Sequence, residues 1–170
     1  MVETINNHPV AESKIWEDMQ CPVLRQWTQQ FLFKSMHNTY MIGNKWMHIQ
    51  HHENRAYCNI CHSIESMKHI LLNCNSVAQC YIWGKAKTLW PQGLETWPNI
   101  TISMILGIGS IQPPQGPQNE DDTRAPTMAD RGRTRLLQIL IAEASHLIWV
   151  IRCERTIQNK QYMESQLEQR

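Results

Sequence analysis

The stretch YCNICHSIESMKHILLNCNSV, residues 57–77, decides how the fold of this chain is interpreted. Two residues separate Cys58 from Cys61, seven more precede His69, and four more precede Cys74. A Cys-x-x-Cys turn lets two sulfur atoms converge on one ion, and a short helix after it can carry the other two ligands to the same point. Three sulfurs and one nitrogen suit zinc, whereas magnesium and calcium require oxygen ligands. We therefore expect one structural Zn²⁺ with no position left open for water.

Two alternatives to this ligand set stay open on the sequence alone. Free buried cysteines, or a redox pair made by Cys58 and Cys61, would explain the first spacing but leave the histidine and the third cysteine without a role. A redox motif also follows a strand, and the residues before Cys58 show no convincing strand pattern. His62 and Cys80 are the residues best placed to replace a ligand. The ring of His62 would have to fold back, however, and Cys80 lies about a turn and a half into the next expected helix.

Helical periodicity runs through most of the chain. Apolar residues recur at helical spacing in residues 13–19, 23–40, 63–72 and 76–90. The last 40 residues give the strongest pattern, with good helix formers and no internal glycine or proline after Gly132. We expect an all-α fold, a small helical bundle organised around the zinc site, with a long C-terminal helix buried against the earlier ones.

A proline-rich stretch divides the chain. Residues 111–130 contain four prolines and almost no large apolar side chain, a composition that cannot form a packed core. We therefore expect a helical zinc-binding module over 1–110, a linker or loop over 111–130, and a C-terminal helix over 131–170 that packs on the module. Asp121 and Asp122 are adjacent carboxylates in this stretch, and solvated loop charge is the favoured interpretation for both.

Composition restricts the class of protein only loosely. The 170 residues, 42% of them hydrophobic, suffice for one ordinary domain, and a formal net charge of +1 does not by itself announce a nucleic-acid partner. The start, MVETINNHPV, shows no secretory leader, so we expect an intracellular protein, nuclear or cytoplasmic, with reduced cysteines. The most apolar run, residues 136–151, is short for a membrane span and interrupted by polar side chains, so no membrane partner is expected.

Four segments of the chain resemble the reverse transcriptase zinc-binding domain of non-LTR retrotransposons. They are FLFKSMHNTYMIGNKW before the cysteines, CNICHSIESMKHILLNCNSV through them, QCYIWGKAKTLW after them and AEASHLIWVIRCERTI near the end. Together they cover about residues 31–160, and the later part is most similar to fungal members that follow a ribonuclease H domain. The resemblance implies the same ligands, Cys58, Cys61, His69 and Cys74. The carboxylates that polymerase or ribonuclease H catalysis needs are not found, so no catalytic residue is expected.

The favoured function is a structural zinc-binding module derived from a retrotransposon reverse transcriptase polyprotein. It would support nucleic-acid binding or domain docking without catalysis of its own, with RNA, single-stranded DNA or adjacent domains of a parent polyprotein as partners. The candidate phosphate contacts are Lys85, Lys87, Arg131, Arg133 and Arg135, although an ordinary solvated face is the favoured interpretation of both groups. The alternatives are a protein–protein interaction module, a decayed fragment of a ribonuclease H and reverse transcriptase protein, and a Cys-x-x-Cys redox protein.

Overall fold

The computed structural model describes residues 12–18, 20–91, 96–113 and 125–169. The elements are α1 (Glu12–Asp18), α2 (Gln26–Met36), the short helical turns η1 (Gly43–Trp46), η2 (Glu53–Ala56) and η3 (His69–Asn73), α3 (Val77–Leu89), α4 (Ile102–Leu106), η4 (Ile108–Ser110), α5 (Met128–Gln158) and α6 (Glu164–Leu167). The described residues contain no β-strand, apart from one isolated bridge. The expected all-α fold with a long C-terminal helix is confirmed.

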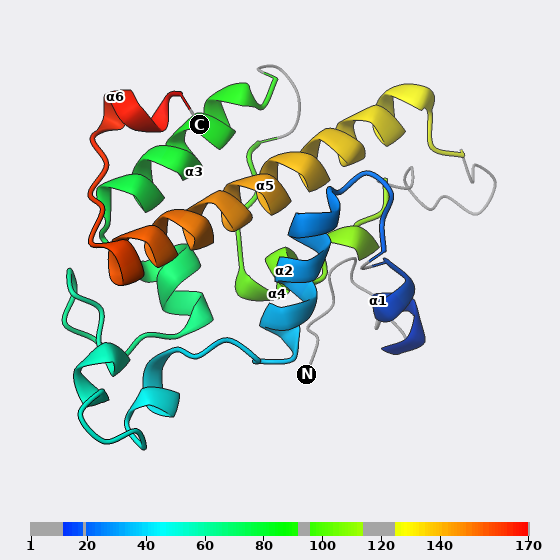
Figure 1. Cartoon of the computed structure of the whole chain (residues 1–170). Coiled ribbons are helices and arrows are strands. Elements are labelled where there is room, and N and C mark those ends of the chain that lie inside the picture. The colour runs from blue at the N-terminus through cyan, green and yellow to red at the C-terminus, as the bar shows by residue number, and fades with distance from the viewer. Residues whose placement is uncertain (1–11, 19, 92–95, 114–124, 170) are drawn as a thin grey trace.

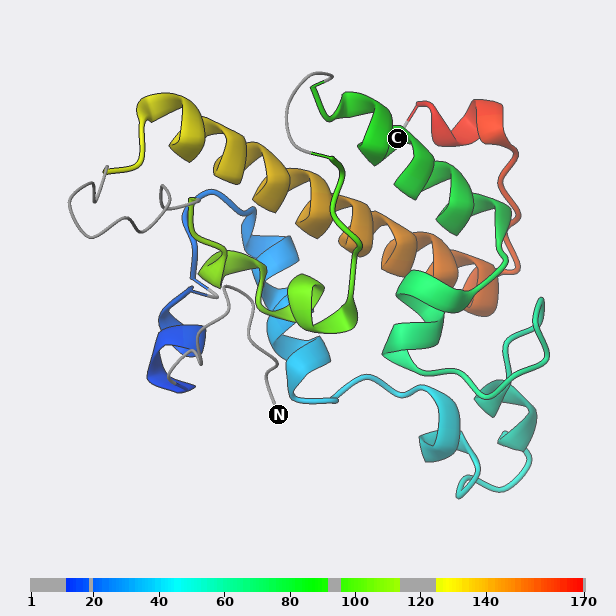
Figure 2. The ribbon, with the colours of Figure 1, turned by 180° about the vertical axis from the view of Figure 1, so that it is seen from behind.

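Helix α5 runs the length of the molecule, and α2, α3 and α4 pack against it (Figures 1 and 2). Helix α3 lies beside it, α6 packs against α3, and α2 contacts α5 where the Thr28 hydroxyl donates a hydrogen bond to Glu143. The core forms between these helices and α4. Its fully buried side chains include Phe31, Ile105 and Ile141. This apolar interior defines the helical body, which we take as α2, α3, α4 and α5.

Local hydrogen bonds set the ends of α5. The Thr127 hydroxyl accepts from the backbone N–H of Asp130 at 3.2 Å, and the Asp130 carboxylate accepts from the N–H of Thr127 at 3.0 Å. This capping box starts the helix at Met128, before the expected residue 131. The helix ends at Gln158 because Asn159 adopts a left-handed conformation. The C-terminal region is therefore not one continuous helix to residue 170. Of the expected linker, residues 114–124, including Asp121 and Asp122, lie outside the described residues.

By length and composition alone, α5 can cross a membrane. It has 31 residues, and its most apolar 18-residue window has a mean hydropathy of 1.5. The expectation that this stretch is too short for a span therefore does not hold for the folded helix. Half of that window is buried inside the protein, however. Glu143 accepts a hydrogen bond from α2, and Arg152 forms a buried ion pair, which is how a core helix is packed.

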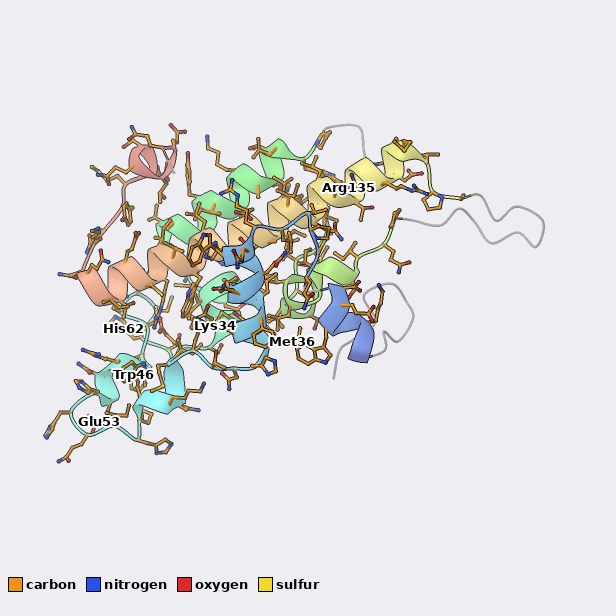
Figure 3. The ribbon with its side chains drawn as sticks, turned by 45° about the vertical axis from the view of Figure 1, so that its right-hand side comes forward. Lys34, Met36, Trp46, Glu53, His62 and Arg135 are labelled. Atoms are coloured by element: carbon orange, nitrogen blue, oxygen red, sulfur yellow. The ribbon has the colours of Figure 1, made fainter. Side chains whose placement is uncertain are left out.

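Residues 41–66 project from one end of the body, below the C-terminal end of α5, and we call them the knuckle lobe (Figure 1). Figure 3 shows its labelled side chains Trp46 and Glu53 standing away from the body. Gly43 has a φ of +55°, and a Cβ at this position would overlap the backbone carbonyl of Glu65. Glycine therefore allows both the left-handed turn and the close approach of η1 to the following segment.

Candidate metal centre

A tight turn brings the first two cysteines together. The backbone N–H of His62 donates to the carbonyl of Cys58 at 2.9 Å, and the N–H of Cys58 donates to the carbonyl of Ser63 at 2.8 Å. The antiparallel bridge between Tyr57 and Ile64 closes the hairpin. His62 adopts a φ of +55°, which reverses the chain directly after Cys61.

A short helical segment delivers the other two ligands. A continuous helix was expected over 63–72, but the chain becomes helical only at Met67 and widens into the π-type turn η3. Residues 63–65 are engaged in the hairpin instead, and the Ser66 hydroxyl accepts from the N–H of His69 at 3.0 Å as a cap. Ile70 and the residue after it are buried against the body, which leaves His69 facing the hairpin.

The four predicted ligands lie together. Their ligand atoms are all within 4.8 Å of one another. The Sγ atom of Cys74 is 3.8 Å from that of Cys58 and 3.8 Å from that of Cys61. Two sulfurs bound to one zinc ion at about 2.3 Å in a tetrahedron lie about 3.8 Å apart, so this spacing is the one that a shared metal ion requires. Cys58 and Cys74 are buried, and the other two ligands are half-buried.

The ring of His69 is oriented for metal binding. Its Nδ1 atom lies 3.4 Å from the Ser63 hydroxyl, whereas its Nε2 atom is buried and has no hydrogen-bond partner among the described residues. A buried polar atom without a partner is costly, and such atoms mark sites where an ion or a water is bound. In metal sites one ring nitrogen binds the ion while the other bonds to a neighbouring polar group. His69 has this arrangement.

The surroundings act in opposite directions on the thiols. The backbone N–H of Asn75 donates to the Cys61 sulfur at 3.3 Å, and this hydrogen bond is the main cause that lowers the pKa of Cys61. Burial raises the pKa of Cys74 to about 11 in the absence of a metal ion, and the nearby Cys58 adds to the effect. A metal ion must therefore displace a firmly held proton from Cys74, so metal affinity is expected to fall as the pH falls.

The two residues considered as substitute ligands lie outside the group. His62 is exposed, and Cys80 is exposed on α3 with its thiol directed to the side-chain oxygen of Gln79 at 3.6 Å. Throughout the part of the chain that the structure describes, Cys58, Cys61, His69 and Cys74 form the one group of potential metal ligands.

Sequence reasoning missed a buried ion pair next to the centre. The Nε atom of Arg152 on α5 donates to the Glu65 carboxylate at 3.2 Å, and a second guanidinium nitrogen contacts the other carboxylate oxygen. Both side chains are less than a tenth exposed. The Arg152 guanidinium also lies over the ring of Trp149. Glu65 belongs to the hairpin, so this pair joins the knuckle lobe to the body.

The candidate phosphate contacts lie in two groups away from the ligands. The Lys85 ammonium is 2.9 Å from the Glu168 carboxylate and 5.3 Å from the centre of the Tyr81 ring, so it is already partnered. Lys87 is exposed nearby on α3. Arg131 and Arg135 are exposed and Arg133 is half-buried in the first turns of α5. Figure 3 shows Arg135 at the opposite end of α5 from the knuckle lobe.

Comparison with known proteins finds no match to a protein-family model, a curated protein or a solved structure. The resemblance to the reverse transcriptase zinc-binding domain therefore stays a prediction. The interpretation of the site rests on the geometry of the four candidate ligands.

Proposed function

We propose that this chain is a structural zinc-binding module. The observation that supports it most is the spacing of the ligand atoms, with Cys74 Sγ 3.8 Å from both other sulfurs and a partnerless, buried Nε2 on His69. Zn²⁺ accepts three thiolates and an imidazole in tetrahedral geometry, and these soft ligands disfavour magnesium and calcium.

The proposed role of the ion is structural because the protein supplies four ligands. A catalytic zinc site keeps a position open for water or substrate, whereas a Cys₃His set fills the tetrahedron. When bound, the ion would hold the hairpin of the knuckle lobe, the turn η3 and the start of α3 together.

Metal stoichiometry tests the proposal. Native mass spectrometry of the full chain, expressed with zinc in the medium, should show one zinc per chain, and Cys74→Ser should lose it. Cys80→Ser is the matched control, because Cys80 is an exposed cysteine outside the ligand group, and it should keep the metal. A metal-free wild-type chain, or a Cys74→Ser variant that binds and unfolds like the wild type, would contradict the proposal.

Thiol reactivity separates the zinc site from a redox pair. Thiolates bound to zinc should react slowly with a mild alkylating reagent and become reactive once a chelator is added. A redox pair predicts the opposite, namely a fast-reacting thiol at Cys58 or Cys61 that a chelator does not affect. Mass spectrometry of alkylated peptides assigns the reactive residue.

We further propose that the module serves a retrotransposon reverse transcriptase polyprotein by binding RNA or single-stranded DNA, without catalysis of its own. The support is the resemblance over about residues 31–160 and the exposed basic side chains Lys87, Arg131 and Arg135. Phosphate contacts release counterions, so binding should weaken steeply with salt. Fluorescence anisotropy with labelled RNA and DNA strands at several salt concentrations checks this, and no binding at low ionic strength would refute it.

A surface groove favours a second candidate function, docking to another protein or domain. The groove has a volume of about 570 Å³ and lies between α3 and α5, with Leu89 65% exposed and Ile139 38% exposed along it. Exposed apolar side chains of this kind mark interaction surfaces. Sedimentation analysis should then show self-association that Leu89→Glu reduces, and a wild-type monomer at high concentration would count against docking to a second copy.

A further inference from the structure

The C-terminal end of α5 presents two arginines to the knuckle lobe. Arg152 is neutralised by Glu65. Arg155, one turn later, is half-buried, and its Nε atom is buried without a hydrogen-bond partner in the described part of the chain. Among the described residues no carboxylate forms a salt bridge with it. A buried guanidinium nitrogen is costly to leave unpaired, so its position requires a partner that these protein groups do not supply.

Arg155 lies beside the metal ligands. It lines a small internal cavity together with Cys74 and Ser76, and the space of about 10 Å³ holds one water at most. Arg155 and the candidate ligand Cys74 therefore border the same small space.

Metal binding would create the missing partner. One divalent cation with three thiolates and a neutral imidazole leaves one negative charge on the centre. Cys58 and Cys74 are buried, so water screens this charge poorly. A buried net charge is tolerated when an opposite charge lies close to it. Because Glu65 already neutralises Arg152, Arg155 is the other arginine at the C-terminal end of α5 that can provide that charge.

We propose that Arg155 is the counter-charge of the metal centre, a positioning residue that balances the thiolate charge and thereby attaches the metal-loaded hairpin to α5. This inference rests on the proposed zinc site and adds that the metal affinity depends on a residue of α5. Arg155 is not a ligand, so the coordination itself does not need it. Its loss weakens metal binding because the charged centre then lacks a partner, and groups surrounding the ligands typically change metal affinity by about 10–100-fold.

Three variants of the full chain test this proposal. Arg155→Met removes the charge and keeps the aliphatic length, whereas Arg155→Lys keeps the charge. Arg131→Met is the control, because Arg131 is an exposed arginine at the other end of the same helix. Zinc affinity is measured by competition with a chromogenic chelator. We expect Arg155→Met to bind zinc about 10–100-fold more weakly, Arg155→Lys to lie close to the wild type, and Arg131→Met to be unchanged.

Cobalt substitution shows whether the ligand set stays intact. The Co²⁺-loaded Arg155→Met variant should keep the wild-type sulfur-to-metal absorption bands. Equal zinc affinity of Arg155→Met and the wild type would overturn the proposal, and so would an Arg155→Lys variant as weak as Arg155→Met. If circular dichroism shows that Arg155→Met does not fold, the zinc affinities of Arg155→Gln and Arg155→Lys are compared instead. A wild-type chain without metal would refute the zinc site itself, which is a distinguishable result.

Discussion

The helical body and the knuckle lobe are built on different physical principles. In the body, Phe31, Leu32 and Ile141 are almost fully buried within an apolar cluster. In the lobe, Tyr57 and Ile60 are exposed. The buried residues of its hairpin are the candidate ligand Cys58 and the ion-paired Glu65. The body thus has the apolar burial that folds a domain, while the lobe depends on a few specific contacts.

This difference bears on where a bound metal ion would act. The sequence alone predicted a helical bundle organised around the zinc site. The structure places the ligands at one end of a body that has its own core. Metal removal is therefore expected to affect the two regions unequally.

The largest expected effect is that of chelation on the knuckle lobe. Structural zinc contributes on the order of 10 kcal/mol in small modules, more than the lobe can replace with apolar contacts. Hydrogen exchange measured by mass spectrometry should show that residues 41–66 lose protection after chelation, while the amides of α2 and the middle of α5 stay protected. Simultaneous loss of protection in both regions would show that lobe and body are one cooperative unit.

The second-largest expected effect is the loss of stability from a substitution in the core of the helical body. Phe31→Ala removes a fully buried ring that packs against the rings of Tyr40, His146 and Trp149. It should lower the free energy of unfolding by about 3–5 kcal/mol in urea denaturation of the zinc-loaded protein. The control is Trp27→Ala on the same helix, where a side chain 71% exposed should change stability by no more than about 0.5 kcal/mol. Equal losses of stability in the two variants would mean that α2 packs against the core through another face.

A change at the boundary between the lobe and the body should lower the free energy of unfolding by about 3 kcal/mol. Glu65→Gln leaves Arg152 buried without its counter-charge, which is costly. Urea denaturation measures this loss, and the double variant Glu65→Leu/Arg152→Met should recover part of it because no buried charge is left unpaired. A single variant with unchanged stability would indicate that water replaces the carboxylate.

The smallest expected effect concerns the start of α5, far from the knuckle lobe. Thr127→Ala removes the hydroxyl that accepts from the N–H of Asp130 and should cost about 1 kcal/mol. Zinc affinity should not change, since the cap lies at the opposite end of the helix from the ligands. Thr156→Ala, at an exposed position near the end of α5, is the control and should be close to neutral. A loss of metal affinity in Thr127→Ala would show that the two ends of α5 are coupled.

The metal ligands were predictable because they are close in sequence. Cys58 and Cys74 are separated by 16 positions, and the spacing between ligands reports directly on a turn and a short helix. The start of α5 was misplaced because the prolines before it outweighed the capping pattern of Thr127 and Asp130. Both residues are visible in the sequence, so this error was avoidable.

The partners of the charged residues were not predictable. Glu65 and Arg152 are 87 positions apart, and Lys85 and Glu168 are 83 apart. Nothing local distinguishes Glu65 from a surface glutamate, or Lys85 from a free cation. Such pairings follow from how helices pack in three dimensions, whereas the periodicity of apolar residues indicates only which face of each helix is buried.

Glu65 has a consequence for protein engineering. Its carboxylate binds Arg152, its N–H donates to the carbonyl of Ala56, and its own carbonyl lies where a side chain at position 43 would be. A hairpin with this proposed metal site would be a candidate for insertion into other scaffolds. Transplanting residues 57–77 alone would separate Glu65 from both Gly43 and Arg152. A functional graft must therefore supply a glycine turn before the hairpin and an arginine on the recipient helix.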